Sequence, residues 1–293
     1  MDTCVIKFCR GLYLKTTLHL VEKDTIYALS AMLLWSTVAS AFKIALSSMP
    51  PATLLLYASS FSTMIFFVIL LLQKRIKRSL FSKEKIKRAI PLGFLNPFLY
   101  YNLLFASYSR LPAQQAQALG LSWPVMTALL LPLLHRGHTD RKGMLAALIS
   151  FSGVCVISLR IVSLAGALLA LSAALVWTVY WLENTRENTT ESLFLNFLFG
   201  TMFSSVIFML NPNIPENPIP ALYIGAFEMG ITFLLWQTAL SLSKNITRTS
   251  NLIYLMPFIS LLFIQGVLNE RIEITTIPGL ILIIGGVLLQ TKR

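Results

Sequence analysis

The sequence predicts an all-α integral membrane protein with ten transmembrane helices, arranged as two inverted five-helix repeats. Three observations predict this fold: the composition, a succession of ten apolar windows, and an internal repeat. The 293-residue chain is 56% hydrophobic and 12% charged, and its mean hydropathy is +0.71. Ordinary soluble domains are roughly 45–50% apolar and about 25% charged. A soluble fold cannot bury so much apolar surface, so we expect the bilayer to be the solvent of most of this chain.

The apolar windows follow one another with short connections. A transmembrane helix needs about 20 mostly apolar residues. Ten windows qualify, at residues 25–47, 52–72, 89–108, 112–134, 143–159, 163–182, 192–210, 220–241, 246–268 and 275–291. Residues 1–24 precede them as a predicted cytoplasmic segment, without an apolar core long enough for a cleavable signal.

The basic residues give the orientation. In membrane proteins, lysine and arginine accumulate in cytoplasmic connections. With the N-terminus inside, three of the 24 basic residues fall on outer connections, namely Arg110, Arg160 and Arg271, and Lys43 falls within the first span. All the others lie on inner segments, many of them in the basic run at 74–88. We therefore expect a multi-pass protein of the cell inner membrane with both termini in the cytoplasm.

An internal repeat divides the chain into two halves, 25–159 and 163–291. The segment ALSAMLLWS at 28–36 matches ALSAALVWT at 170–178, with six of nine positions identical. LGFLN at 92–96 also pairs with IGAFE at 224–228, and Trp123-Pro124 pairs with Met256-Pro257. Because each half holds an odd number of spans, the second copy is expected to be inverted. Such repeats place the substrate site near the midplane, where the halves meet.

The third and fourth spans, at 91–134, contain many polar residues and four prolines. The polar residues are Asn96, Tyr100, Tyr101, Asn102, Gln114, Gln115, Gln117 and Ser122. At membrane depth, polar residues tend to face a bundle interior or a water-filled path. Prolines are tolerated there where neighbouring helices or water satisfy the freed carbonyls. We expect this hairpin to line a transport pathway.

Glu228 and Lys43 are charged residues within the predicted spans. Glu228 lies about eight residues into the eighth span, roughly 12 Å below the outer surface. An ionisable residue at that depth is costly and is a functional candidate. It could accept a substrate ammonium group, carry a coupling proton, or form a structural hydrogen bond. Lys43 could extend its ammonium to the interface, or turn inward to meet Glu228 or a substrate carboxylate.

Tryptophan, proline and further polar residues complete the candidate pathway. Trp35, Trp123, Trp177 and Trp236 lie well inside spans, as cavity walls or as packing, whereas belt tryptophans favour the interfaces. Pro124 and Pro257 predict kinks. Thr249, Ser250 and Asn251 enter the ninth span from the inside, as Gln114, Gln115 and Gln117 enter the fourth from the outside. These groups either form a polar vestibule at each mouth or hydrogen-bond neighbouring helices.

Other function classes have little support in the sequence. The segment HRGHTD, with His135, His138 and Asp140, is a short basic loop that we do not expect to hold a metal. Cys4, Cys9 and Cys155 have no zinc-like spacing and imply no disulfide framework. The chain has no Walker A, H-E-x-x-H or G-x-S-x-G motif. We therefore expect no enzymatic activity, no cofactor, no metal and no nucleic-acid partner.

Four segments resemble the drug/metabolite transporter superfamily, specifically its ten-span type with two EamA domains. They are LLWSTVASAFK at 33–43, LYYNLLFASYSRLPAQQAQALGLSWP at 99–124, FEMGITFLLWQTALSLSK at 227–244, and LLFIQGVLNERIEITTIPGLILIIGGVLL at 261–289. The middle two are similar to the branch that contains the bacterial aromatic amino-acid exporter. The resemblance implies secondary transport of small metabolites through a central cavity. Where related members read Leu-Asn-Tyr-Thr-Trp-Pro, residues 119–124 here read LGLSWP, which makes the cavity wall less polar and roomier.

The expected function is export of amino acids or similar small metabolites by alternating access, by a monomer or homodimer. The expected pathway residues are Trp35, Lys43, Asn96, Tyr100, Tyr101, Gln117, Ser122, Trp123, Pro124, Glu228, Trp236, Asn251 and Pro257, with Glu228 as the candidate for proton coupling. Uptake or exchange of another metabolite or drug remains an alternative. A membrane scaffold or sensor that presents the basic run at 74–88 to a partner is an alternative from another class.

Overall fold

The computed structural model describes residues 22–123, 141–184, 189–243 and 252–291, together with residues 126, 130 and 249. Within these residues the chain is helical and has no strand. The elements are α2 (Lys23–Ser48), α3 (Pro51–Leu72), η1 (Arg78–Phe81), α4 (Lys83–Gly93), η2 (Phe94–Leu99), α5 (Tyr100–Tyr108), α6 (Ala113–Gly120), α8 (Arg141–Ser158), α9 (Leu164–Asn184), α10 (Thr190–Leu210), α11 (Ile219–Phe227), α12 (Ile231–Leu242), η4 (Leu252–Leu255), α14 (Met256–Leu268) and α15 (Thr276–Thr291). Each of the ten predicted windows overlaps at least one of these helices.

Six helical stretches are long and apolar enough to cross a bilayer. They are Lys23–Ser48, Pro51–Leu72, Lys83–Tyr108, Leu164–Asn184, Thr190–Leu210 and Ile219–Leu242, and shorter apolar helices cover Leu148–Ile157, Met256–Leu268 and Thr276–Gly286. Their outer faces are apolar as well: Leu72 is 77% exposed and Leu210 is 78% exposed. Contiguous apolar surface of this kind is unusual on a soluble monomer. The chain is therefore a multi-pass membrane protein.

Two of these stretches are interrupted at similar depths. In Lys83–Tyr108 the π-helical turn η2 separates α4 from α5, and Asn96 within it has non-helical angles of φ −144° and ψ 121°. In Ile219–Leu242, α11 ends at Phe227 and α12 begins at Ile231, with Glu228 at the end of the first segment. The sequence match of 92–96 with 224–228 aligns Asn96 with Glu228. The two breaks thus fall at corresponding positions of the two halves.

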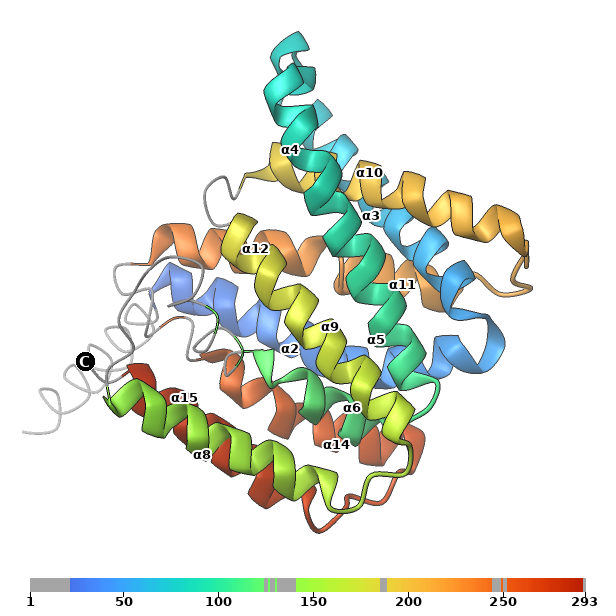
Figure 1. Ribbon diagram of the computed structural model, residues 1–293. Helices are drawn as coiled ribbons and strands as arrows, with labels where there is room; N and C mark the ends of the chain where they lie inside the picture. The colour runs from blue at the N-terminus through green and yellow to red at the C-terminus, as the bar shows by residue number, and fades with distance from the viewer. Residues whose placement is uncertain are drawn as a thin grey trace, which may run out of the picture.

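The helices pack across the two halves of the chain (Figure 1). α2 packs against α12 and α14, and α9 packs against α5 and α6. α3 packs against α11, and α10 packs against α4. Two further pairs, α3 with α10 and α8 with α15, each join one helix of the first half to one of the second. Every described α-helix of the first half therefore has a partner in the second.

Glycines allow the closest of these approaches. A Cβ added to Gly153 in α8 would lie 2.5 Å from the carbonyl oxygen of Gly279, and one added to Gly279 in α15 would lie 2.9 Å from that of Gly153. Small residues at such crossings let two membrane helices touch backbone to backbone. The reciprocal contact fixes α8 directly against α15.

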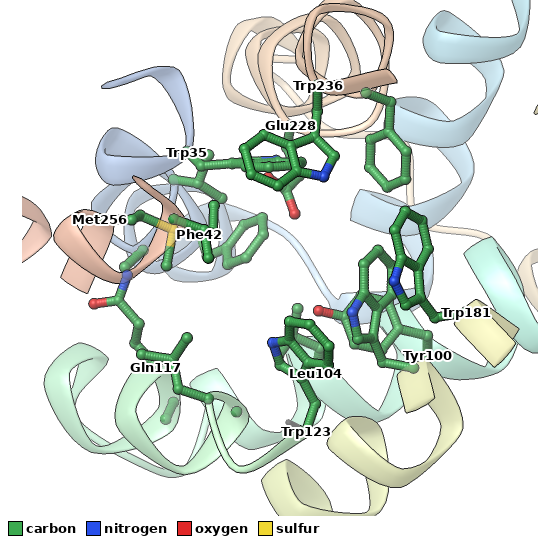
Figure 2. A pocket seen from close by; sticks show the side chains of 18 of the residues that line it. Trp35, Phe42, Tyr100, Leu104, Gln117, Trp123, Trp181, Glu228, Trp236 and Met256 are labelled. Atoms are coloured by element: carbon green, nitrogen blue, oxygen red, sulfur yellow. The ribbon is translucent and has the colours of Figure 1, made fainter. Parts of the chain in front are cut away.

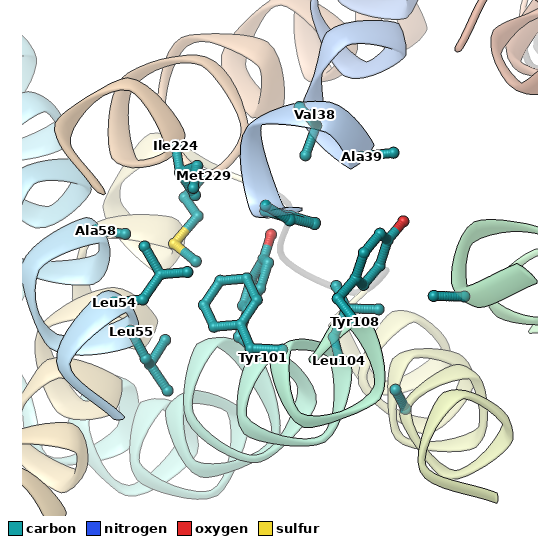
Figure 3. Packing of buried hydrophobic residues seen from close by; sticks show 14 of the residues in the cluster. Val38, Ala39, Leu54, Leu55, Ala58, Tyr101, Leu104, Tyr108, Ile224 and Met229 are labelled. Carbon is teal, nitrogen blue, oxygen red and sulfur yellow. The ribbon is translucent and has the colours of Figure 1, made fainter. Parts of the chain in front are cut away.

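A continuous apolar core connects the broken spans to the helices around them. Figure 3 shows Tyr101 and Tyr108 of α5 between α2, which contributes Val38, and α3, which contributes Leu54. Met229, at the break between α11 and α12, packs into the same cluster. Tyr101 and Met229 have no exposed surface. The chain next to both breaks is thus held in well-packed surroundings, which limits its freedom.

Candidate functional site

A cavity of about 390 Å³ lies in the middle of the helix bundle, between the two halves (Figure 2). The volume falls in the range of roughly 300–1,000 Å³ that is usual for small-molecule sites. α2, α5 and α6 form its wall from the first half, and α9, α12 and α14 form its wall from the second. Neither half encloses the space alone, so a bound molecule would contact both.

The wall is predominantly aromatic. All five tryptophans of the chain line the cavity: Trp35, Trp123, Trp177, Trp181 and Trp236. The Trp35 ring centroid lies 5.7 Å from that of Trp236 and 6.0 Å from that of Phe233. Ring pairs at such separations contribute beyond their buried area. The wall residues therefore support one another and present pre-positioned faces to the cavity.

A second aromatic cluster is centred on Trp177 of α9. Its ring centroid lies 4.8 Å from that of Tyr100, and its ring stacks on Trp181 with 7° between the planes and 6.0 Å between centroids. Trp177 and Trp35 align in the sequence match of 28–36 with 170–178. Each half of the chain thus places one tryptophan at the centre of an aromatic cluster.

Glu228 is the charged residue among the described side chains that line the cavity. It follows the last residue of α11, its side chain points into the open space in Figure 2, and it is 8% exposed. Its Oε1 accepts a hydrogen bond of 3.0 Å from the hydroxyl of Tyr101. Because the break ends α11 here, the carboxylate projects from a helix end into the cavity, while Tyr101 fixes its orientation from behind.

Lys43 does not form the hypothesised pair with Glu228. Its Nζ donates hydrogen bonds to the carbonyl oxygens of Tyr108, at 3.0 Å, and Leu111, at 2.9 Å. A cation suits the carbonyl groups that a helix leaves unpaired at its C-terminus. The ammonium therefore ties α2 to the end of α5 instead of facing the cavity.

The turn between α5 and α6 is joined to the connection between α14 and α15. Both carboxylate oxygens of Glu270 accept from the backbone N–H of Ala113, at 3.0 Å, which satisfies a free donor at the start of α6. The amide of Gln114 donates to the Arg271 carbonyl at 2.7 Å and accepts from the Glu273 N–H at 2.7 Å. Together with Lys43, these contacts close one end of the bundle, which we call the α5–α6 end.

The connection between α8 and α9 is held at the same end. Gln115 donates to the carbonyl of Arg160 at 3.0 Å. Gln114 and Gln115 are both buried. Of the three glutamines expected either at a vestibule or in hydrogen bonds to neighbouring helices, Gln117 lines the cavity, whereas the amides of Gln114 and Gln115 bind backbone groups of connections.

The cavity extends toward the opposite end of the bundle. Its lining reaches Trp181 and Leu240, close to the last residues of α9 and α12. Both side chains are partly exposed, whereas Phe42 and Tyr108, which line the cavity toward the α5–α6 end, are buried. The gradient in exposure indicates a space that is closed at the α5–α6 end.

The structure sorts the predicted pathway residues into three groups. The residues that line the cavity are Trp35, Tyr100, Gln117, Trp123, Glu228 and Trp236. The described residues outside the lining are Lys43, Tyr101, Asn96, Ser122 and Pro257. Pro257 occupies the first turn of α14, where the backbone nitrogen of a residue has no partner within the helix, so a proline costs no hydrogen bond. The proline predicted to kink a span therefore marks the start of a helix. Pro124 and Asn251 lie outside the described residues.

Other lining residues were not among those predicted from the sequence. They include Phe42, Tyr108, Trp181, Phe233 and Met256. The repeat contained a signal for one of them, because Met256 aligns with Trp123. Trp177, expected as cavity wall or as packing, also lines the cavity. Phe42 and Tyr108 are ordinary apolar span residues in the sequence, and only their packing places them at the cavity.

The described part of the chain contains no cluster of side chains suited to binding a metal ion. No group of three or more histidine, cysteine, aspartate or glutamate side chains suited to a metal is present among the described residues. His135, His138 and Asp140 lie outside them. The arrangement is instead that of an enclosed binding site with aromatic faces and a carboxylate.

Comparison with known proteins gives a consistent result. A model described as the EamA-like transporter family matches residues 24–159 and again residues 164–291. An uncharacterized transporter in the sor 3' region of Acidianus ambivalens is 26% identical over 67% of this chain and 81% of its own length. The uncharacterized transporters YvbV and YyaM of Bacillus subtilis (strain 168) are 24% and 22% identical, over 72% and 76% of this chain and 75% and 79% of their own lengths. A protein of known crystal structure shares the fold, with a TM-score of 0.65 and 20% identity over 92% of this chain and 96% of that one.

Proposed function

This chain belongs to the EamA-like transporter family, and from that premise we propose that it is a secondary transporter of amino acids or similar small metabolites that works by alternating access. The observation that carries the proposal is the central cavity, which both halves enclose beside their two broken spans. Discontinuous helices in corresponding positions of two halves are a recurrent feature of transporter binding sites. Glu228 and the tryptophans would contact the substrate there.

We propose further that the chain crosses the membrane ten times, as two inverted five-span repeats over 25–159 and 163–291. The family model matches each half separately, with nearly these bounds. Packing partners are also exchanged between the halves: α2 packs against α12 as α9 packs against α5, and α3 against α11 as α10 against α4. An approximate two-fold axis in the membrane plane would generate these exchanges.

In this proposal the structure represents one state of the transport cycle. The α5–α6 end is closed by Lys43, Glu270 and Gln114, whose partners belong to helices or connections distant in sequence. The distribution of lysine and arginine supports placing this end on the outer side of the cell inner membrane, with both termini in the cytoplasm. The cavity would then face the cytoplasm. Rocking of one half against the other would break the Glu270 and Gln114 contacts, which join the two halves, and open the outer side.

Transport toward the outside would follow from loading the cavity in this inward-facing state. Export is thus the direction that we propose, driven by the gradient of the substrate or of protons. Because alternating access is reversible, uptake or exchange uses the same site and the same states. The direction in the cell is set by the gradients and not by a different structure.

Counterflow into proteoliposomes tests the proposed function. The purified protein is reconstituted with millimolar unlabelled compound inside, and entry of the labelled compound is measured for a panel of amino acids, amines and nucleosides. We expect saturable counterflow of at least one compound, which Trp123→Ala abolishes and Met202→Ala, on the exposed face of α10, leaves intact. If the native protein gives no counterflow beyond protein-free liposomes for the whole panel, transport is refuted and a scaffold or sensor role takes its place.

A further inference from the structure

The charged residues of the cavity wall indicate which charge a substrate would carry. Among the described residues that line the cavity, Glu228 bears a formal charge and no lysine or arginine is present. The other polar groups of the wall are the hydroxyls of Tyr100 and Tyr108, the amides of Gln117 and Gln237, and the indole N–H groups of the tryptophans. The described wall is therefore anionic, and its remaining polar partners are uncharged.

The nearest lysine in sequence to this wall is already engaged. Lys43 follows the lining residue Phe42, but its Nζ donates to two carbonyl oxygens at the α5–α6 end. A substrate carboxylate would thus find no cationic partner among the described lining residues. It would also lie in the same enclosed space as the carboxylate of Glu228, and two like charges in a space of low dielectric repel one another.

An ammonium group, unlike a carboxylate, would find a partner of opposite charge in the cavity. The hydroxyl of Tyr101 donates a hydrogen bond to Oε1 of Glu228, and the carboxylate points into the open space in Figure 2. Trp35 and Trp236, whose ring centroids lie 5.7 Å apart, line the same cavity as the carboxylate. Aromatic faces attract cations, tryptophan most strongly, and aromatic enclosures are the usual receptors of quaternary ammonium groups.

The remainder of the wall suits an apolar body. Trp123, Trp177, Trp181 and Phe233 contribute ring surface, and Leu104 and Leu121 contribute aliphatic surface. Gly120 contributes no side chain, so the wall is open next to Trp123. The volume of about 390 Å³ admits one molecule of the size of an aromatic amine.

We propose that the substrate of this cavity is a small organic monocation, an amine or quaternary ammonium compound with an apolar or aromatic body and no free carboxylate. Glu228 binds the cationic head and the tryptophans enclose the body. This proposal rests on the proposed transport function, and it narrows the substrate class from amino acids and similar metabolites to amines that lack the amino-acid carboxylate.

Binding to the intact purified chain tests the proposal with probes that share one indole body. Isothermal titration calorimetry compares tryptamine, a cation, with tryptophan, a zwitterion, and indole-3-acetate, an anion. We expect tryptamine to bind at least tenfold more tightly than tryptophan, and indole-3-acetate not to bind. Equal or tighter binding of tryptophan overturns the proposal, as does the absence of saturable binding of tryptamine, phenethylamine and benzyltrimethylammonium at millimolar concentration.

A charge-neutral variant assigns the preference to the carboxylate. Glu228→Gln should weaken tryptamine binding at least tenfold and remove the preference over tryptophan, whereas Glu183→Gln, an exposed residue near the end of α9, should change neither. Unchanged tryptamine binding by Glu228→Gln overturns the assignment; if that variant does not fold, the probe comparison on the native chain decides.

Counterflow in the same preparation separates the substrate proposal from the transport proposal. Amino-acid counterflow without amine binding overturns the inference alone, and amine binding without counterflow of any compound overturns transport alone.

Discussion

The hydroxyls of Ser36 and Thr178 lie between equivalent pairs of carbonyl oxygens in the two halves of the chain. Ser36 donates from Oγ to the carbonyl of Met32 in its own helix, at 2.8 Å, and lies 3.3 Å from the carbonyl of Met256 at the start of α14. Thr178 donates to the carbonyl of Ala174 in its own helix, at 2.9 Å, and lies 3.1 Å from the carbonyl of Trp123.

The shared geometry follows from the repeat. The match of 28–36 with 170–178 aligns Ser36 with Thr178, and a second match aligns Met256 with Trp123. Each hydroxyl therefore joins the first span of one half to the predicted fourth span of the other, immediately beside the cavity. Both contacts cross the boundary between the halves, where a rocking motion would act.

Removing either hydroxyl should weaken the junction between the halves. We expect Ser36→Ala and Thr178→Val each to cost about 1 kcal/mol, the usual scale of a polar contact between membrane helices, and to lower counterflow severalfold. Thr178→Ser keeps the hydroxyl and should retain activity. The measurements are thermal unfolding in detergent and counterflow in proteoliposomes.

The matched control for these variants is Ser205→Ala. Ser205 donates only to the carbonyl of Thr201 within α10, among the contacts that the structure describes. Its loss should leave both measurements unchanged. Equal effects of Ser205→Ala and Ser36→Ala would show that the contact to the opposite half has no special role.

Glu228→Gln should remove any response of transport to a proton gradient, because an amide cannot take up and release a proton at the cavity. Tyr101→Phe keeps the carboxylate and loses only its 3.0 Å hydrogen bond, so it should retain the response with lower activity. Counterflow at several external pH values, with the internal pH held constant, measures the response. A gradient response that persists in Glu228→Gln would reject Glu228 as the coupling site.

The sequence predicted the helical windows and much of the cavity because both depend on local patterns. Apolar run length located the helices, and polar residues within such runs pointed to Gln117 and Glu228. Tryptophans away from the interfaces pointed to Trp35, Trp123 and Trp236. These residue types are costly or unusual in lipid, so their presence indicates an interior surface wherever the helices lie.

Features that depend on the arrangement of helices in space were not predictable in the same way. Lys43 could have met Glu228, but the carbonyls of Tyr108 and Leu111 are closer, and no local pattern encodes that distance. The break at Asn96 is suggested by the following Pro97, yet the second break, at Glu228, has no proline and only its alignment with Asn96 marks it. Internal comparison of the halves was the more informative signal.

Gly153→Ala should separate α8 from α15. The added Cβ would lie 2.5 Å from the Gly279 carbonyl oxygen and 2.8 Å from the backbone nitrogen of Ile283, neither of which can move without shifting the helix. We expect a destabilisation of about 1–3 kcal/mol, the usual range for overpacking, observed as a lower unfolding temperature. Gly285→Ala, in α15 with no atom within 4 Å of the added Cβ, is the control and should have no such effect. Equal unfolding temperatures for the two variants would contradict the close contact.

Lys43→Met and Glu270→Gln should loosen the α5–α6 end. Each removes a charge that binds backbone groups of the turn between α5 and α6. In a background with Cys4, Cys9 and Cys155 replaced by serine, the variant Ala116→Cys places a thiol at the buried cavity wall. We expect Lys43→Met to raise its labelling by a membrane-impermeant maleimide from outside severalfold, while Arg110→Met, an exposed cation of the same turn, does not. Equal labelling rates in Lys43→Met and the unaltered background would rule out Lys43 as a closing contact.

Gly120→Leu should reduce the size of the molecules that the cavity accepts. Gly120 lines the cavity beside Trp123, and a Cβ added there meets no atom within 4 Å, so a larger side chain can enter the empty space without displacing a helix. We expect counterflow of indole-sized compounds to fall at least tenfold and that of compounds with a small aliphatic body to fall much less. Gly266→Leu, in α14 outside the cavity lining and also unobstructed, should leave both unchanged. A parallel fall for large and small compounds, with an unaltered unfolding temperature, would mean that Gly120 affects the transport cycle and not the volume of the site.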